Sequence, residues 1–194
     1  MNTDKNVEKI ENHLLNNQQK MADIIESREI KPELNLTEKE RRLIYDFDAI
    51  GFSCGKYNEE ECCFGSGGFI KYLSYTEDGV PVMNAYAISA SSNDEELITM
   101  RDVAGELLGV IGIIMESVKN CYESILILYN YEGIKKWATA EWECTKKWTK
   151  KYNNMYNEVT KGMNITFLKI DEDTQVSGFE EAERLAKMAV GLDV

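Results

Sequence analysis

The sequence contains a single histidine, His13, among its 194 residues. His13 lies in a polar segment near the N-terminus, outside the part of the chain that is rich in apolar residues. Catalytic devices of the Ser-His-Asp or Cys-His type need an imidazole beside the nucleophile. The histidine count therefore argues against these devices, and equally against a metal site built from histidines.

Cysteine is present in a number and spacing that suit neither disulfides nor zinc. The five cysteines are an odd number, and Cys62 and Cys63 are adjacent, unlike the C-x-x-C spacing of zinc sites. Free thiols in a reducing compartment are the better interpretation. The sequence also lacks a run of about 18 apolar residues, which a membrane span needs, and lacks a signal-peptide core. We therefore expect a cytoplasmic protein with no membrane partner.

Positive charge is scarce over most of the chain. The net charge is −12, which argues against nonspecific binding to nucleic acid because Lys and Arg make the phosphate contacts. The charge is distributed unevenly along the chain, however. Residues 132–161 hold seven Lys and four Glu, a net charge of +3, which leaves −15 for the remainder. We call residues 132–161 the basic island.

The first 40 residues differ in composition from the rest. Apolar residues recur with a heptad-like spacing at Val7, Ile10, Leu14, Met21 and Ile24, with Asn17 at the gap. This pattern fits either an amphipathic helix that packs on its own domain or a homodimer through residues 5–25. Residues 28–40 contain Pro32 and many charges, and resemble a linker. We therefore predict an N-terminal helix and linker over residues 1–40 and a separate domain over residues 41–194.

From residue 41 onward the patterns predict a mixed α/β domain. Three β-rich stretches come first: RRLIYDFDAIGFSCG, CCFGSGGFIKYLSY and VPVMNAYAISA, with a turn at Glu77-Asp78-Gly79. A helix over residues 94–120, a buried strand in SILILYN, helices near 132–140 and 146–161, a strand in MNITFLKI and a last helix that ends at Gly191 follow. The order β-β-β-α-β-α-α-β-α predicts one mixed sheet with helices on its faces. The glycines of GSGG, residues 65–68, lack the Lys-Ser/Thr of a phosphate loop and predict close backbone packing.

Three stretches resemble the ribonuclease H family, specifically its type 1 bacterial branch. MRDVAGELLGVIG (100–112) is similar to the family's first helix, YNYEGIKKWATAEW (129–142) to its Y-D-Y-E-G-I-x-K-W segment, and SGFEEAERLAKMAV (177–190) to its last helix. They occur in the family's order within residues 42–191. The resemblance implies a five-stranded mixed sheet flanked by helices, here with an extra N-terminal helix.

The resemblance also implies a two-metal nuclease that cuts the RNA strand of an RNA–DNA hybrid. That chemistry needs about four carboxylates around two Mg²⁺ ions roughly 4 Å apart. The family positions match Cys54, Glu106, Asn130 and Glu183. A neutral amide offsets none of the repulsion between the metals, and a thiol is a soft ligand that Mg²⁺ does not favour. We therefore expect an inactive site that binds a metal weakly through Glu106 and Glu183 or not at all.

Two other outcomes remain open at the site. A shifted first strand would bring in Asp46 or Asp48, and the loop before the last helix offers Glu172. With such rewired ligands the chain would be an active two-metal ribonuclease that uses Mg²⁺ or Mn²⁺. Without them, we expect no cofactor.

An aromatic and basic set falls where the family grips its DNA strand. By resemblance, we expect contacts to nucleic acid or to a partner from a set of six residues: Arg101, Lys146, Lys147, Trp148, Lys150 and Lys151. Nearby Trp137 and Trp142 fit core positions better. The alternative is that Trp148 also belongs to the core and that the lysines form a solvated helix face.

Three functions are compatible with these observations. The favoured one is an inactive ribonuclease H-like binding or regulatory module for an RNA–DNA hybrid, an RNA duplex or a nucleic-acid-binding protein. The second is an acidic, phage-type inhibitor that mimics nucleic acid and occupies a nuclease. The third is the active enzyme with rewired ligands.

Overall fold

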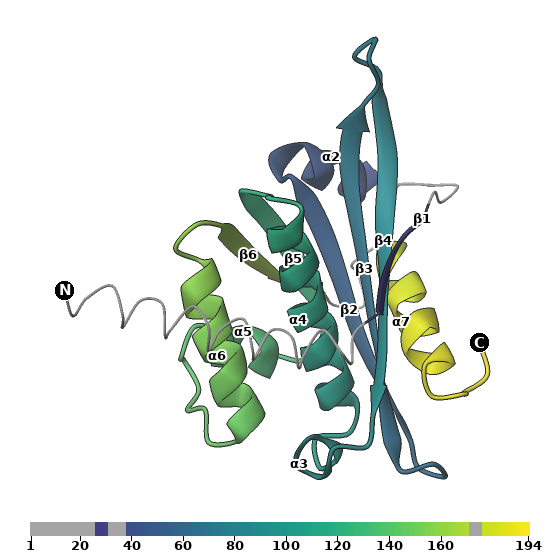
Figure 1. Ribbon diagram of the computed structural model, residues 1–194, viewed down its shortest axis with the longest axis vertical. Helices are drawn as coiled ribbons and strands as arrows, with labels where there is room; N and C mark the ends of the chain where they lie inside the picture. The colour runs from purple at the N-terminus through teal and green to yellow at the C-terminus, as the bar shows by residue number, and fades with distance from the viewer. Residues whose placement is uncertain (1–25, 31–37, 171–175) are drawn as a thin grey trace, which may run out of the picture.

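The structure is a computed structural model that describes residues 26–30, 38–170 and 176–194. The predicted N-terminal heptads, the possible dimer seam and Glu172 lie outside these residues. The described residues form one six-stranded sheet in the order β1-β4-β3-β2-β5-β6, flanked by helices (Figure 1). The strands are β1 (Glu26–Ile30), β2 (Ala49–Asn58), β3 (Cys63–Tyr75), β4 (Pro81–Ser92), β5 (Ser124–Tyr129) and β6 (Asn164–Lys169). The helices are α2 (Glu38–Asp46), α3 (Glu95–Ile98), α4 (Asp102–Lys119), α5 (Gly133–Ala138), α6 (Lys147–Val159) and α7 (Gly178–Met188).

The predicted mixed sheet is confirmed, with all five expected strands present. β2, β3 and β4 form an antiparallel meander, and β5 and β6 continue from β2 in parallel. The Glu77-Asp78-Gly79 turn is also confirmed, because Gly79 has a φ of +74° and its N–H donates to the Thr76 carbonyl. The sixth strand, β1, pairs antiparallel with β4.

Two expectations about the first half of the chain are wrong. Residues 28–40 are not simply a linker, since β1 runs to Ile30 and α2 begins at Glu38. The stretch that begins at Arg42 is not strand throughout, because residues 38–46 are helix and β2 begins at Ala49. The spacing of the buried Ile44 and the half-buried Leu43 and Phe47 places them on one helical face against the sheet.

The expected helix over residues 94–120 is interrupted. α3 begins after Asp94, whose carboxylate accepts from the N–H groups of Glu96 and Leu97 at 2.9 and 3.1 Å, a typical N-cap. It ends at Ile98, and α4 starts only after Arg101, whose φ of +50° breaks the helical path. The N-cap of α3 is therefore Asp94.

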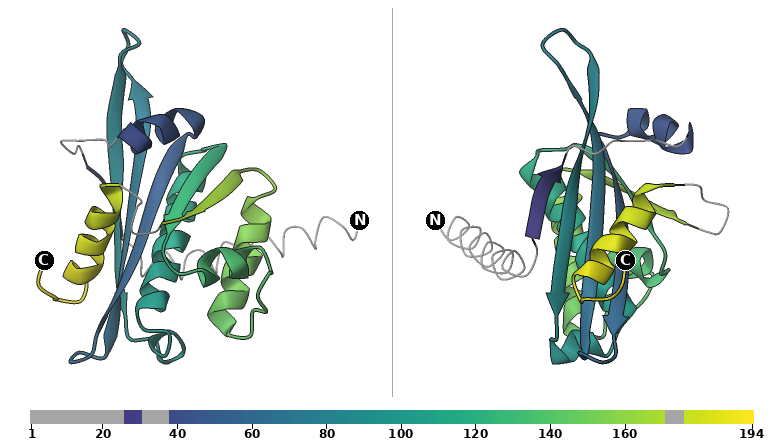
Figure 2. Two further views of the ribbon diagram at one scale, coloured as in Figure 1. Left: turned by 180° about the vertical axis from the view of Figure 1, so that it is seen from behind. Right: turned by 90° about the vertical axis from the view of Figure 1, so that its right-hand side faces the viewer.

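The helices cover both faces of the sheet (Figure 2). One apolar cluster joins the sheet to α4, α5 and α6, with Leu107, Ile111 and Tyr152 fully buried. The other joins the opposite face to α2 and α7, with Phe52 and Ala182 fully buried. Among the described residues, none of the helices is both long and apolar enough to cross a membrane.

Glycines let two helices approach the sheet backbone closely. A Cβ on Gly67 would collide with the Ala182 carbonyl of α7, and a Cβ on Gly55 would collide with the Asp102 carbonyl of α4. The prediction that GSGG marks close backbone packing is therefore confirmed. The close approach of α4 to β2 brings Glu106 next to Cys54.

A buried polar network attaches α2 to the sheet and to α7. Lys71 Nζ lies 3.0 Å from Glu40 Oε1 and donates to Ser177 Oγ at 2.8 Å. The Gly178 N–H donates to the same Glu40 carboxylate at 3.1 Å. Glu40 and Lys71 are both inaccessible to solvent. The predicted domain boundary at residues 40/41 falls within α2, and Glu40, on its N-terminal side, is buried against the sheet.

Candidate functional site

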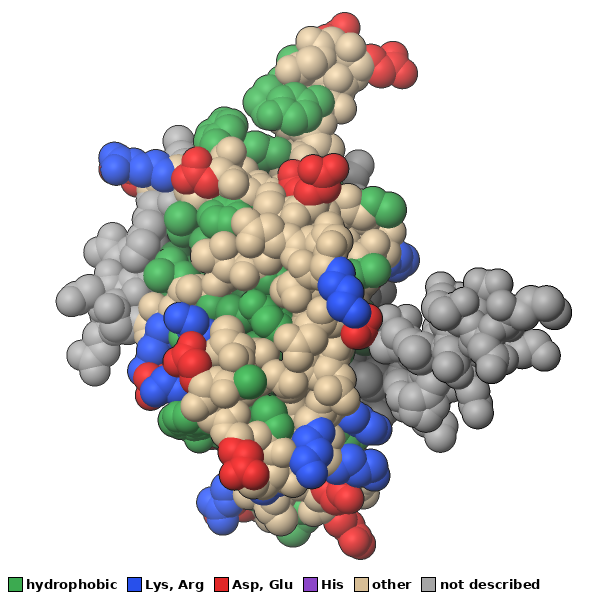
Figure 3. Space-filling model, turned by 90° about the vertical axis from the view of Figure 1, so that its left-hand side faces the viewer, with side chains coloured by type: hydrophobic (Ala, Val, Ile, Leu, Met, Phe, Trp, Pro, Cys, Tyr) green, Lys and Arg blue, Asp and Glu red, His purple; other side chains and the backbone are tan. Residues whose placement is uncertain are grey.

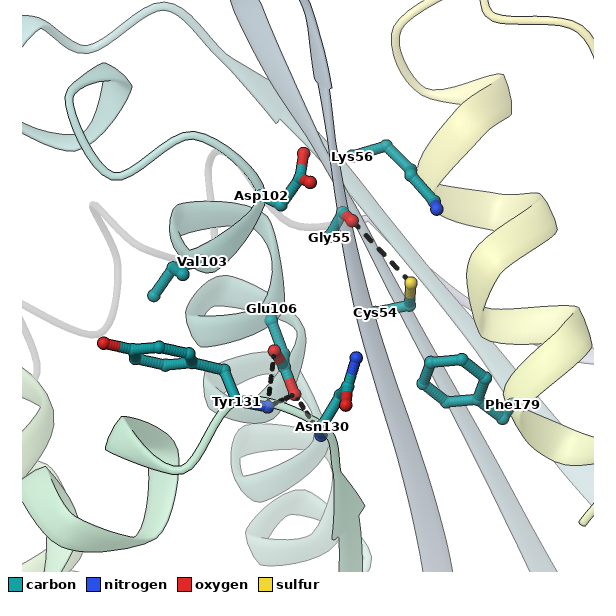
Figure 4. A pocket seen from close by; sticks show the side chains of 9 residues that line it. All are labelled: Cys54, Gly55, Lys56, Asp102, Val103, Glu106, Asn130, Tyr131 and Phe179. Atoms are coloured by element: carbon teal, nitrogen blue, oxygen red, sulfur yellow. Dashed lines mark hydrogen bonds between the residues drawn. The ribbon is translucent and has the colours of Figure 1, made fainter. Parts of the chain in front are cut away.

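A pocket of about 340 Å³ opens between β2, α4, the end of β5 and the start of α7 (Figure 4). Its lining includes three of the four predicted site residues, Cys54, Glu106 and Asn130. Asn130 directly follows β5, as the sequence predicted, because the apolar strand ends at Tyr129. The fold therefore assembles these positions at one place, at the carboxyl end of a parallel strand.

Glu106 binds the protein's own backbone. One carboxylate oxygen accepts from the Asn130 N–H at 2.5 Å and from the Tyr131 N–H at 3.1 Å, and the other accepts from Tyr131 at 3.2 Å. The side chain is only 6 % exposed. Burial raises the pKa of Glu106, and the two N–H donors offset part of that rise. Glu106 thus fixes the turn after β5 from the adjacent helix (Figure 4).

Cys54 is a neutral thiol. Its Sγ is buried and donates a hydrogen bond to the Gly55 carbonyl at 3.7 Å. Burial raises the pKa of Cys54 to about 12, and the nearby Lys56 cation offsets only part of that rise. At neutral pH the group therefore carries no charge and is a poor nucleophile as well as a poor ligand for a hard metal ion.

Glu183 forms an ion pair with Lys56. The Lys56 Nζ lies 2.7 Å from Glu183 Oε1, and Lys187 Nζ lies 3.5 Å from the same oxygen. The hydrogen bond from Lys56 lowers the pKa of Glu183, and the same bond raises the pKa of Lys56. Figure 4 shows the Lys56 side chain directed from β2 towards α7. The carboxylate at the fourth position is therefore neutralised by a cation of the protein itself.

Sequence reasoning missed Lys56. The sequence does contain a signal for it, because Lys56 is a cation only two residues after the predicted site residue Cys54. Asp102 and Phe179, which also line the pocket, were not predicted either. Asp102 is an exposed carboxylate in the first turn of α4.

The alternative ligands Asp46 and Asp48 lie elsewhere. Asp46 ends α2, and Asp48 precedes β2, whereas Cys54 lies six residues further along that strand. The Asp48 carboxylate accepts from the N–H groups of Glu123 and Ser124, both at 2.8 Å, at the start of β5. The expectation that these aspartates could enter the site is wrong, since they lie at the opposite end of both strands.

The donor set does not fit two Mg²⁺ ions. Of the four family positions only Glu106 and Glu183 are carboxylates; the first is occupied by backbone donors and the second by Lys56. Among the described residues, no group of three or more His, Cys, Asp or Glu side chains lies in an arrangement that could hold a metal ion. Two divalent cations need several anionic oxygens to offset their mutual repulsion.

Five of the six predicted contact residues, those between positions 146 and 151, lie at the start of α6, and Arg101 directly precedes α4. Lys146 and Lys150 are exposed, Lys151 is half-buried, and none of the three forms an ion pair among the described residues. Lys147 pairs with Glu96 at 3.4 Å. Figure 3, which views this side of the molecule, shows cationic and acidic side chains interspersed. The basic island is thus partly neutralised.

Two predicted contacts have other surroundings than expected. Trp148 is only 6 % exposed and belongs to the core, with Lys151 Nζ 4.5 Å from its ring centroid. The structure therefore favours the alternative interpretation, in which Trp148 belongs to the core. Arg101 is exposed, but its guanidinium donates to Glu59 at 3.1 Å and lies over the Tyr57 ring.

A second pocket of about 330 Å³ adjoins the first, and the two share Val103 and Tyr131. Trp137, Lys146 and Thr149 lie on its wall. Tyr131, Trp137 and Trp142 form one aromatic cluster, with ring centroids 5.7–6.2 Å apart. Trp137 and Trp142 are half-buried. Lysine and aromatic side chains therefore line the surface between the first pocket and α6.

Comparisons with known proteins identify the architecture. No protein-family model matches the sequence, and no curated protein matches it. Among solved structures, the N-terminal ribonuclease H domain of a Mycobacterium tuberculosis protein, fused to maltose-binding protein, is similar with a TM-score of 0.52 and 14 % identity, over 75 % of this chain and 94 % of that one. LC11-RNase H1 in complex with an RNA/DNA hybrid is similar with a TM-score of 0.50 and 13 % identity, over 73 % of this chain and 99 % of that one. The chain therefore has the ribonuclease H fold.

Proposed function

We propose that this protein is a ribonuclease H fold that binds a nucleic-acid duplex without hydrolysing it. The observation that carries the proposal is the ion pair between Lys56 and Glu183, 2.7 Å long, at the position where the fold's nucleases need a metal-binding carboxylate. The ammonium group of Lys56, on β2, neutralises the Glu183 carboxylate. Unlike a divalent metal ion, this ammonium does not activate a water molecule for hydrolysis. Metal-dependent hydrolysis needs an ion that polarises a phosphoryl oxygen and generates hydroxide.

Three features together support loss of hydrolysis. The Cys54 thiol is uncharged, the Asn130 amide is uncharged, and Glu106 is held by two backbone donors. A single missing carboxylate could be compensated by a neighbour. Here, two are missing and one of the remaining two is already paired, so the charge needed for two Mg²⁺ ions is absent.

Duplex binding is supported by the lysines beside the second pocket. Lys146 and Lys150 are exposed at the start of α6, and Lys146 lines the pocket wall with Trp137. Lysines neutralise phosphates, while aromatic faces pack on sugars or bases. LC11-RNase H1, which shares this fold, was solved with an RNA/DNA hybrid. An RNA–DNA hybrid is accordingly the first ligand to test.

Two measurements test this proposal. Calorimetric titration with Mn²⁺ should give no binding in the low millimolar range. A native gel with an end-labelled hybrid should give a shifted band whose affinity falls with salt, with a slope of log K against log salt of about −2 to −3 for a few phosphate contacts. The proposal fails if Mn²⁺ binds tightly or if no shift occurs at low salt.

Matched variants locate the duplex surface. Lys146→Gln with Lys150→Gln removes two charges from the proposed surface, and should reduce the salt slope by about 2. Arg42→Gln with Lys119→Gln removes two exposed charges from α2 and from the far end of α4. This control should leave the affinity unchanged. Equal loss in both variants would indicate a nonspecific effect of net charge.

A second function is favoured by the net charge of −12. An acidic protein of this fold could occupy a basic nucleic-acid-binding protein, such as a nuclease, as a mimic of its substrate. The same native gel discriminates the two functions. A hybrid that does not shift at low salt favours the inhibitor.

A further inference from the structure

The β3–β4 hairpin extends past the rest of the molecule. Its end, residues 75–82, consists of eight consecutive exposed residues, and we call it the arm. In Figures 1 and 2 the arm projects beyond the sheet and beyond every helix. The preceding pair Leu73 and Met83 still packs on the core. The arm itself therefore contributes little to burying apolar surface in the protein.

Hydrogen bonds hold the arm in one conformation. The Thr76 N–H donates to the Val80 carbonyl, and the Gly79 N–H donates to the Thr76 carbonyl, both at 2.9 Å. The Thr76 hydroxyl accepts from the Val80 N–H at 3.1 Å. A preorganised element loses less conformational entropy when it binds. These three hydrogen bonds define the turn at the end of the arm.

Apolar side chains lie exposed on both faces of the arm. Tyr75 is 64 % exposed, Val80 56 % and Val82 39 %. Tyr75 is opposite Pro81 in the ladder and Val82 is opposite Ser74, so the two pairs lie on opposite faces. A flat surface would cover only one of these faces. A cleft that receives the arm would cover both.

The charge of the arm identifies the class of its partner. Glu77 and Asp78 are exposed at the tip, and residues 75–82 contain no Lys or Arg. Figure 3 shows acidic groups at this projecting end, next to hydrophobic ones. Phosphates would be repelled, and a second copy carries the same net charge of −12, which opposes its approach. We propose that the arm inserts into an apolar cleft with a basic rim on a different protein, with Glu77 and Asp78 pairing with its Lys or Arg side chains.

Site-specific crosslinking in the full chain tests this inference. A photo-crosslinking amino acid at position 80 is activated in a nuclease-treated extract of the cells that naturally produce the protein, and mass spectrometry identifies the products. The charge reversal Glu77→Lys with Asp78→Lys is compared with Glu60→Lys and Glu61→Lys, the same charge change on the exposed β2–β3 turn at the opposite end of β3. Thermal unfolding checks that each variant is folded.

The expected product is a crosslink to a protein whose contact segment is rich in Lys and Arg. Its yield should fall about tenfold in the arm reversal, which corresponds to about 1.4 kcal/mol, and should be unchanged in the turn reversal. The inference is overturned by any of four results: no crosslinked protein, crosslinks to a second copy, a yield that the arm reversal leaves unchanged, or equal loss in both reversals. Because duplex binding is assigned to α6, failure here leaves the proposed function intact.

Discussion

Lys56 Nζ and Glu183 Oε1 lie 2.7 Å apart, so a carboxylate of the last helix is neutralised by a lysine of β2. In a two-metal site the same carboxylate would face a divalent cation. Lys56 is two residues from Cys54, whose thiol is uncharged at neutral pH. The loss of negative charge and the gain of positive charge therefore occur on one strand, and together they explain why the pocket suits no pair of Mg²⁺ ions.

Restoring the charges should restore metal binding. The triple variant Cys54→Asp, Lys56→Ser, Asn130→Asp places carboxylates at all four family positions and removes the competing cation. We expect Mn²⁺ binding that calorimetry detects in the triple variant and not in the native protein. Lys56→Ser alone is the control, and should bind far more weakly because the thiol and the amide remain. A triple variant that binds no better than the control would show that the backbone geometry, rather than charge, excludes the metals.

Glu106 should behave as a structural acceptor. Glu106→Ala leaves the N–H groups of Asn130 and Tyr131 without their acceptor, at a cost of about 1–3 kcal/mol in the free energy of unfolding. Glu106→Gln keeps an acceptor oxygen at the same place. It removes only the charge of a carboxyl group whose pKa is raised by burial. We expect its free energy of unfolding to lie within about 1 kcal/mol of the native value. Urea unfolding measures both, and equal destabilisation would contradict this role.

The Glu40–Lys71 pair should be essential for stability. Glu40→Ala leaves the Lys71 ammonium buried without that carboxylate and should cost about 3–5 kcal/mol. The double variant Glu40→Gln, Lys71→Met removes both charges and should recover most of that loss. Denaturant unfolding of the two variants gives the comparison. A small effect of Glu40→Ala would mean that α2 is only loosely attached to the sheet.

The Lys56–Glu183 pair predicts a dependence of stability on pH. The folded-state pKa of Glu183 lies below its ordinary value of 4.5, so its stabilisation is present above that value and is lost as pH falls through the folded-state pKa. The folded-state pKa of Lys56 lies above 10.5, so its stabilisation is present below that value and is lost at higher pH. Unfolding midpoints of the native protein and Glu183→Gln should therefore differ between about pH 5 and pH 10 and converge in acid. If the difference between the two unfolding midpoints stayed constant down to the most acidic pH, the Lys56–Glu183 pair would not be the source of the stabilisation.

Much of the fold could be predicted because its signals are local. The apolar run that ends at Tyr129 places Asn130 beside the pocket, and the glycines at 65–68 indicate where α7 approaches the sheet. α2 was missed because its apolar residues also fit a strand in a short β-rich window. Its attachment to the sheet uses the pair of Glu40 and Lys71, a contact between distant residues that periodicity does not encode.

The candidate site was predicted in part for the same reason. The resemblance to the ribonuclease H family identified Cys54 and Asn130. The partner of Glu183 could not be found that way, because the Lys56–Glu183 pair forms only when β2 and α7 meet across the sheet. The lysines beside Trp148 in the sequence are compatible with a surface or a core position, and the structure places its ring in the core.

Cleavage of an RNA–DNA hybrid tests the central claim most directly. Purified protein is incubated with an end-labelled hybrid in Mg²⁺ and then in Mn²⁺, beside Glu106→Gln, and the products are separated on a denaturing gel. The account predicts intact RNA in every lane, or the same trace cleavage for both proteins from a contaminant. Cleavage by the native protein that Glu106→Gln abolishes would contradict it, and would show that the chain is an active nuclease with rewired ligands.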